Sequence, residues 1–176
     1  MTAIVIGIDP GLSGALARFE SGVLTDICDV PADTRTLHRT GSGIRDLIGG
    51  KKVVTRRSVS GPGLARLLRE WTMAHSAVVV KERMSTRPNQ NSSQLMKADG
   101  VLTGVIAGVG IELLEVDPNR WKQLMGVPAD KEKARAIAIE LFPSWKHLFA
   151  RKMDHNRAEA ALIGLYGVRY PEVRAS

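Results

Sequence analysis

The stretch Ile4–Gly14 (IVIGIDPGLSG) places the tightest constraint on the fold of this chain. It begins with an almost unbroken β-branched apolar run, which is typical of a strand that is covered on both faces. Asp9 follows where such a strand would reach solvent, and Pro10 fixes the backbone there. Gly11 and Gly14 allow a sharp turn and a close approach of a ligand to the backbone. Asp9 is therefore either a turn residue bonded to its own backbone or part of a site, and acidic residues at other strand and helix ends would favour the site.

The composition fits one globular domain with a polyanionic partner. The chain has 176 residues, of which 44% are hydrophobic, and Lys and Arg outnumber Asp and Glu by 25 to 18. The net charge of +7 favours a nucleic-acid partner, although ribosomal and membrane-surface proteins share such a balance. Cys28 is the only cysteine, which excludes a disulfide or a thiolate metal site within one chain. There is no signal peptide and no run of about 18 apolar residues, so we expect a cytoplasmic protein that is not secreted and has no membrane partner.

The apolar pattern predicts an α/β fold. Strands are expected at 4–9, 15–19, 22–30, 77–82 and 111–116. Helices are expected at 61–71, 92–108, 118–125, 131–141 and 155–167, with a polar loop at 83–93 and a basic connector at 144–153. We predict a single domain, residues 1–170, followed by a short tail at 171–176. Its central mixed sheet is expected to have three antiparallel N-terminal strands and then parallel strands, with helices on both faces.

The same pattern predicts which side chains face the core. Burial in the strand at 77–82 is expected to extend through Val80. Apolar stripes at helical spacing are expected to bury Leu95, Ala98, Leu102 and Val105 in the helix at 92–108. Leu141 and Leu165 are among the residues that the later helices are expected to bury.

A basic segment at 33–57 interrupts this pattern, with Arg, Lys and His side chains among glycines. We expect a mobile basic hairpin or loop there. It is either a site of polyanion contact or a solvated surface excursion, and the sequence does not choose between them.

A ridge of glycines lies in the predicted helix at 92–108, where Gly100, Gly104 and Gly108 recur every fourth residue. Each glycine costs about 1 kcal/mol relative to alanine in a helix. We therefore expect a close backbone approach in return, either to the sheet or to a second copy of the same helix.

Acidic side chains stand at three separate ends of predicted elements. Asp9 ends the first strand, Glu82 ends the strand at 77–82, and Glu159 borders the apolar stripe of the last helix. Carboxylates without cysteine or clustered histidine suit a hard divalent cation such as Mg²⁺, whereas a structural ion pair is the simpler alternative. Asn156 lies three residues before Glu159 and shares its helix face, while Asp154 would reach the same place only from before the helix start.

These motifs together resemble the RuvC-type Holliday junction resolvases, and the closing motif resembles their phage-encoded and organellar branch. The resemblance covers nearly the whole chain in the right order. The motifs that carry it are Gly7–Gly11, the strand ending in Glu82, Val116–Pro118 with Trp121–Lys122, Ala129–Lys131, and Asp154–Ala160.

The resemblance implies a ribonuclease-H-like fold, a homodimer and two Mg²⁺ ions per site, for which Mn²⁺ is expected to substitute. Asp9, Glu82 and Glu159 map to metal ligands, and the fourth ligand maps to Asn156 or Asp154. An amide at that place is a departure from the family. Either Asp154 is the true ligand, or Asn156 replaces an aspartate and impairs cleavage.

The implied activity is cleavage of four-way DNA junctions in a bacterial or phage-infected cytoplasm by paired, two-metal phosphodiester hydrolysis. Lys131 resembles the basic residue beside the scissile phosphate and is a candidate catalytic residue, although an exposed first-turn lysine is equally expected. Candidate contacts to DNA phosphates are Arg83, Arg87, Lys97, Lys122, Lys131, Lys146, Arg151 and Lys152. Met84–Thr86 stand where bacterial members carry an aromatic wedge.

Two other functions remain open. The glycine turn after Asp9 also resembles the phosphate loop of actin-like and sugar-kinase-like phosphotransferases, but those need a second lobe for which this chain has no room. We therefore expect no nucleotide cofactor. A junction-binding protein without cleavage is the second alternative, which Asn156 allows.

Overall fold

The structure is a computed structural model and describes residues 4–39, 52–73, 75–84 and 92–171. The strands are β1 Ile4–Asp9, β2 Ala15–Glu20, β3 Val23–Asp29, β4 Ala32–Arg39, β5 Lys52–Val59, β6 Ala77–Glu82 and β7 Glu112–Val116. The α-helices are α1 Gly61–Trp71, α2 Ser92–Val109, α3 Pro118–Met125, α4 Lys131–Leu141 and α5 His155–Arg169. Two 3₁₀ helices, η2 Pro143–Phe149 and η3 Lys152–Asp154, lead into α5. No helix in the described part of the chain has the length and apolar character needed to cross a membrane.

The central sheet has five strands in the order β3-β2-β1-β6-β7. β1 pairs antiparallel with β2, and β2 pairs antiparallel with β3. β1 pairs parallel with β6, and β6 pairs parallel with β7. The prediction of a mixed sheet with three antiparallel strands followed by parallel strands is therefore confirmed. Because β1 and β6 are parallel neighbours, their carboxyl ends lie at the same edge of the sheet.

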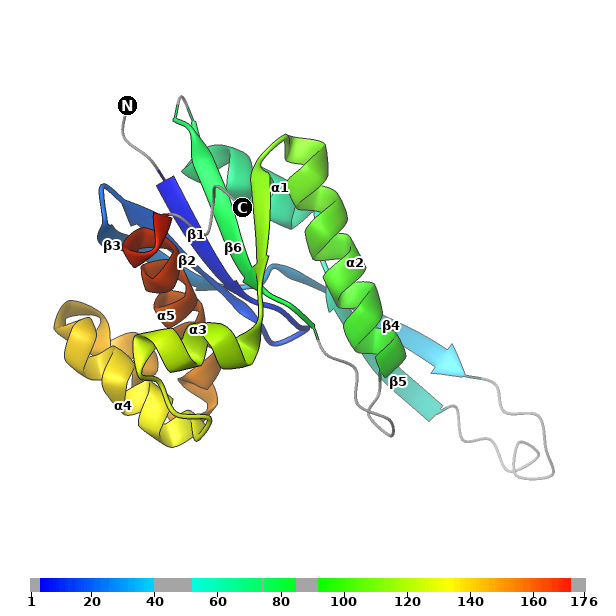
Figure 1. The fold of residues 1–176 in the computed structure, drawn as a ribbon. Helices are drawn as coiled ribbons and strands as arrows, with labels where there is room; N and C mark the ends of the chain where they lie inside the picture. Colours follow the sequence, from blue (N-terminus) through cyan, green and yellow to red (C-terminus); the bar gives the residue numbers. More distant parts are fainter. Residues whose placement is uncertain (1–3, 40–51, 74, 85–91, 172–176) are drawn as a thin grey trace.

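Helices cover both faces of this sheet, as predicted (Figure 1). Ile4, Ile6 and Ile8 of β1 pack into a core with α1 and α2, whereas Val5 belongs to the core on the other face, with α3, α4 and α5. This is the two-residue alternation of a strand that is buried on both sides.

Helix α5 packs directly on β1, because glycines remove the side chains between them. A Cβ on Gly7 would lie 2.2 Å from the carbonyl oxygen of Ala160 and 2.3 Å from the nitrogen of Gly164. A side chain at Gly7 would therefore push α5 away from the sheet. This contact sets the distance between the end of β1 and the first turns of α5.

Helix α2 buries nearly the face that the sequence suggests. Ala98 and Leu102 are buried as predicted, whereas Val105 is only half-buried and Ile106 is buried in its place. A Cβ on Gly100, Gly104 or Gly108 would meet nothing within 4 Å. The glycine ridge therefore faces away from the sheet, and of the two predicted roles only contact with a second copy stays open.

Three further positions differ from the predicted core. Leu95 and Leu165 are half-buried, and Leu141 is exposed at the end of α4. Apolar spacing alone does not distinguish the centre of a buried stripe from its margin. The basic connector at 144–153 lies largely within η2 and η3 instead of an irregular loop.

Burial in β6 extends one residue further than predicted, because Lys81 is fully buried. Its ammonium forms ion pairs with Asp99 of α2 and, at 2.7 Å, with Glu115 of β7. A buried lysine is tolerated only when such partners replace its water. Lys81 thus holds α2 against the sheet edge, on the face opposite Glu82.

The basic segment at 33–57 is a hairpin as far as the structure describes it. β4 and β5 pair antiparallel and form a two-stranded sheet separate from the central one. The hairpin extends beyond the carboxyl ends of β1 and β6, beside the start of α2 (Figure 1). The predicted tip at 40–51 lies outside the described residues.

Candidate active site

Asp9 lies at the carboxyl end of β1, on the face that carries α5. Val5 and Gly7 face α5, so strand alternation directs Asp9 to the same side. The chain then turns sharply, and a Cβ on Gly14 would lie 2.2 Å from the carbonyl oxygen of Asp9. Gly14 is therefore required for β2 to return beside Asp9. The predicted strand, turn and returning strand are confirmed.

Glu82 ends β6 on the same face, one residue beyond the pair formed by Ile8 and Lys81. The indole Nε1 of Trp121 donates a hydrogen bond to Glu82 Oε2 at 2.8 Å. Trp121 belongs to α3, which begins where Asp117 accepts hydrogen bonds from two first-turn backbone N–H groups at 2.9 and 3.0 Å. A capped helix and a fully buried tryptophan thus orient the Glu82 carboxylate.

Glu159 comes from the first turns of α5 and is 6% exposed. Its Oε1 accepts a hydrogen bond from Nζ of Lys122 at 2.8 Å. Burial lowers the pKa of Lys122, but the hydrogen bond to Glu159 and the charges of Glu82 and Asp9 outweigh it and raise that pKa. Lys122 is therefore held as a cation among the three carboxylates.

The three carboxylates repel one another. Burial raises the pKa of Asp9 well above its ordinary value, and the charges of Glu159 and Glu82 raise it further. Burial likewise raises the pKa of Glu82, against the lowering by the Trp121 hydrogen bond and by Lys122. Lys122 and Lys131 only partly offset this repulsion at Asp9. The site holds more negative charge than its own cations neutralise.

The donor set suits a hard divalent cation, although the side chains are not arranged around one. Within the described residues, no three His, Cys, Asp or Glu side chains form a group that could hold a metal ion as they stand. The electrostatic effects on Asp9 nonetheless show that Glu82 and Glu159 are its near neighbours. Oxygen donors whose charges repel one another fit Mg²⁺, provided that Glu159 exchanges its contact with Lys122 for the ion.

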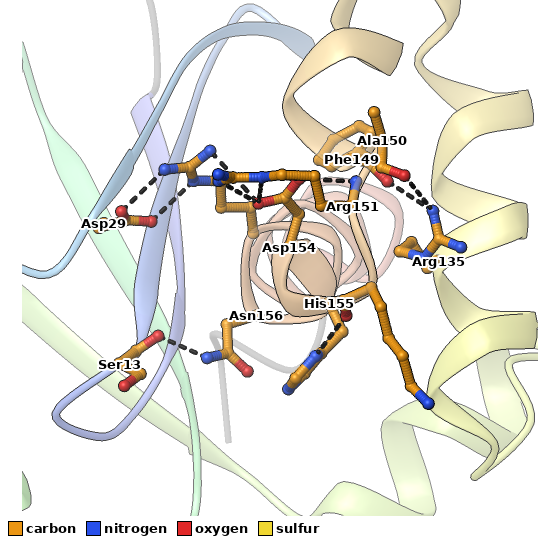
Figure 2. Close-up of polar contacts among 11 residues, drawn as sticks. Ser13, Asp29, Arg135, Phe149, Ala150, Arg151, Asp154, His155 and Asn156 are labelled. Carbon is orange, nitrogen blue, oxygen red and sulfur yellow. Dashed lines mark hydrogen bonds and ion pairs between the residues drawn. The ribbon is translucent and has the colours of Figure 1, made fainter.

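The two candidates for a fourth ligand point in different directions (Figure 2). Asp154 is 4% exposed, and its carboxylate receives the backbone N–H of Arg151 at 2.9 Å and the guanidinium of Arg151 at 2.8 Å. Arg157 lies at 3.7 Å from the same carboxylate. The hydrogen bond from Arg151 is the main cause that lowers the pKa of Asp154. Asp154 is therefore already neutralised by arginine.

Asn156 turns toward the glycine turn that follows Asp9. Its Nδ2 donates a hydrogen bond to the carbonyl oxygen of Ser13, which ties α5 to this turn (Figure 2). The amide is thus used as a donor, which a carboxylate could not supply.

The predicted DNA contacts are spread over several elements. Lys131 is exposed at the start of α4, and its charge lowers the pKa of both Asp9 and Glu82. The other described residues of this set, except the half-buried Lys122, are exposed and comprise Arg83, Lys97, Lys146, Arg151 and Lys152. Arg87 and the end of the predicted wedge region, Ser85 and Thr86, lie outside the described residues.

Sequence reasoning missed the residues that support the acidic ones. Trp121 and Lys122 belong to a noted motif, but their contacts with Glu82 and Glu159 were not predicted. Arg157 forms two hydrogen bonds with Asp29, at 2.7 and 2.8 Å, and was not assigned a role. The Trp-Lys pair one helical turn after Asp117-Pro118 was the available signal for the first two.

Comparisons with known proteins address the fold. No family model matches the sequence, and no curated protein matches it. The solved structure of T. thermophilus RuvC in complex with a Holliday junction substrate is similar, with a TM-score of 0.51 and 14% identity over 96% of this chain and 95% of that one. A further Thermus thermophilus RuvC structure covers the same shares at 16% identity, with a TM-score of 0.49. The chain therefore has the ribonuclease-H-like fold of RuvC, as its motifs predict.

Proposed function

We propose that this protein is a structure-selective endonuclease that resolves four-way DNA junctions by metal-dependent phosphodiester hydrolysis. The observation that carries the proposal is that Asp9 and Glu82 end the neighbouring parallel strands β1 and β6 on the face covered by α5, and that α5 supplies Glu159 from its first turns. The similar RuvC structure is described as bound to a Holliday junction, which supports the choice of substrate.

The residues divide the work as follows. Asp9, Glu82 and Glu159 would together hold the two Mg²⁺ ions. When bound, the ions would activate a water and stabilise the leaving 3′ oxygen. Trp121 orients Glu82, and Lys122 balances Glu159 in the absence of metal. Lys131 would stabilise charge on the scissile phosphate.

A homodimer would present two such sites to opposite arms of a junction and produce paired nicks. The outer face of α2 supports this part of the proposal. Gly100, Gly104 and Gly108 meet nothing within 4 Å, and Met96 on the same helix is 60% exposed. Small residues at this spacing let two helices approach closely.

The test is cleavage of a synthetic four-way junction by the purified protein, with Mg²⁺ or Mn²⁺ and with a linear duplex of the same sequence as control. We expect paired nicks in the junction, no nicks in the duplex, and loss of both nicks in Asp9→Asn. Cleavage that persists in Asp9→Asn would contradict the assignment of the site.

One observation favours the alternative of junction binding without cleavage. The contact between Lys122 and Glu159 neutralises a predicted ligand, as in a structural ion pair. Tight binding of the junction without nicks, both in the parent protein and in Asn156→Asp, would support this alternative. Nicks that appear only in Asn156→Asp would instead identify an impaired nuclease. No observation favours a phosphotransferase.

A further inference from the structure

A basic groove lies between the β4–β5 hairpin and the first turns of α2. Its volume is about 490 Å³, and its lining includes the apolar side chains of Leu12 and Val101. The lining also includes the hairpin residues Arg35, Arg56 and Arg57, together with a lysine and polar side chains of α2. None of the described residues that line the groove is an aspartate or a glutamate.

The hairpin register places like charges opposite each other. Arg35 pairs directly with Arg56, so both side chains leave the same face of the hairpin. Like charges in this arrangement destabilise a two-stranded sheet. Within the described part of the chain, neither arginine nor Lys97 of α2 forms an ion pair, and all are exposed. The fold itself gains nothing from this arrangement of charge.

A second cavity, at the start of α5, shows the opposite arrangement. It is lined by Arg151 and Arg157, but also by Asp154 and Asp29, with which these arginines form ion pairs. Arg57 lines both cavities. The positive charge is therefore neutralised within the protein on one side of Arg57 and left free on the other.

The turn that follows Asp9 borders the groove. Leu12 of this turn lines the groove, and its neighbour Ser13 lines the second cavity. The groove is therefore three residues along the chain from Asp9.

We propose that this groove binds backbone phosphates of the junction arm that leaves the active site, through Arg35 and Arg56 of the hairpin and Lys97 of α2. The inference rests on the proposed function, since it names where the substrate continues. Arginine forks suit phosphate oxygens, and such contacts position DNA without reading its sequence. The occupied groove would also relieve the repulsion between the paired arginines.

The experiment compares Arg35→Gln/Arg56→Gln with the matched control Arg66→Gln/Arg69→Gln, which removes two exposed arginines of α1 outside the groove. Both pairs are made in the Asp9→Asn background so that binding to a four-way junction is measured without cutting. Affinity is recorded across a series of salt concentrations. Affinity falls as salt rises, and each lost phosphate contact makes the slope of log affinity against log salt less steep by about 0.9.

We expect the groove pair to reduce the steepness of that slope by about 1.8 and to weaken junction binding about tenfold or more near 0.1 M salt. The control pair should change neither the slope nor the affinity by much. Arg35→Lys/Arg56→Lys keeps the positive charge and should therefore keep the slope of the parent. It shows whether a change in the glutamine pair comes from lost charge or from a disturbed hairpin. Equal slopes in the groove pair and its parent would overturn the inference.

The outcomes separate this inference from the proposed function. If the parent cuts junctions but the groove pair binds them as tightly as its parent, the proposed function stands and the groove inference is overturned. If the parent never cuts but the groove pair binds junctions more weakly, the proposed function is overturned and the groove inference stands. If the groove pair weakens binding to an RNA duplex but leaves DNA binding unchanged, the DNA assignment is overturned.

Discussion

The two ends of the first turn of α5 hold carboxylates in different electrostatic surroundings. Asp154 precedes the helix and lies among arginines, so that its pKa is lowered, chiefly by the hydrogen bond from Arg151. Glu159, one turn further, faces Asp9 and Glu82, and the pKa values of Asp9 and Glu82 are raised by burial and by the neighbouring acids. Both carboxylates form an ion pair, Asp154 with Arg151 and Glu159 with Lys122, but only Glu159 has two further carboxylates as neighbours.

This difference indicates what each group is for. A carboxylate that accepts several hydrogen bonds from arginine stabilises the fold in its charged form. Carboxylates gathered without enough cations oppose folding, and such groups concentrate at functional sites. We therefore assign Asp154 to structure and the group of Asp9, Glu82 and Glu159 to activity. The following predictions test this division.

The largest effect is expected from Asp9→Asn. If bound metal supplies about 4 kcal/mol of transition-state stabilisation, loss of this proposed metal ligand should slow junction cleavage about 1,000-fold. The same change removes repulsion and should raise the free energy of unfolding. Single-turnover cleavage and urea unfolding of one preparation measure both. An Asp154→Asn variant that loses as much cleavage while still folded would reverse the assignment.

Asp154→Asn should instead act on stability. Arg151 is exposed and regains water when its partner is lost, so the cost is that of the lost charge-assisted hydrogen bonds, which we expect to be about 1.5 kcal/mol. Cleavage by the folded fraction should stay within about tenfold of the parent. Thermal unfolding at pH 7 measures the loss, and an unchanged unfolding free energy would contradict the structural role.

Trp121→Phe should weaken the acidic group indirectly. Phenylalanine keeps most of the packing but cannot donate to Glu82, and loss of such an orienting hydrogen bond typically costs 10–100-fold in metal affinity. The Mn²⁺ concentration that gives half-maximal cleavage should rise accordingly, with little change in the rate at saturating Mn²⁺. A changed rate with unchanged metal dependence would assign Trp121 to packing alone.

The architecture was predictable because it depends on local patterns. The apolar runs at β1 and β6 and the glycine turn at Gly11–Gly14 specify buried parallel strands with a returning hairpin. The glycine ridge of α2 was harder, because spacing fixes which residues share a face and not which face meets the sheet. Lys81 was missed since its burial depends on Asp99 and Glu115, which are distant in sequence.

The sequence predicted that the acidic residues of the site lie near the ends of strands and helices, but it did not predict which ion pairs they form. Asp154 is paired by arginines three residues before and after it, which the sequence places beside it. Glu159 is paired by Lys122, which is distant in sequence and reaches it only through the fold. Residue types therefore indicated the chemistry, and the three-dimensional neighbours of Glu159 could not be predicted from them.

The two groups should also differ in their dependence on pH. The pKa of Asp9 is raised, so its charged form disfavours folding and stability is lost as pH rises from about 3.9 through the folded value. The pKa of Asp154 is lowered, so its stabilisation is present above about 3.9 and is lost as pH falls through the folded value. Urea unfolding between pH 3 and 8 should show Asp9→Asn gaining over the parent only above about pH 4, and Asp154→Asn losing most at neutral pH.

The smallest effect is expected at Asn156, which lies between the two groups. Its Nδ2 donates to the carbonyl oxygen of Ser13, and an aspartate in the same place would set a carboxylate against that oxygen. Loss of this hydrogen bond should cost about 1 kcal/mol and loosen the turn that follows Asp9. Asn156→Asp should therefore lower cleavage several-fold instead of restoring it.

Asn156→Ser, which keeps a small donor, is the control, and its cleavage rate should fall between those of the parent and the aspartate variant. Faster cleavage by Asn156→Asp at equal stability would instead make position 156 a metal ligand, and the boundary between the two groups would then lie before this residue.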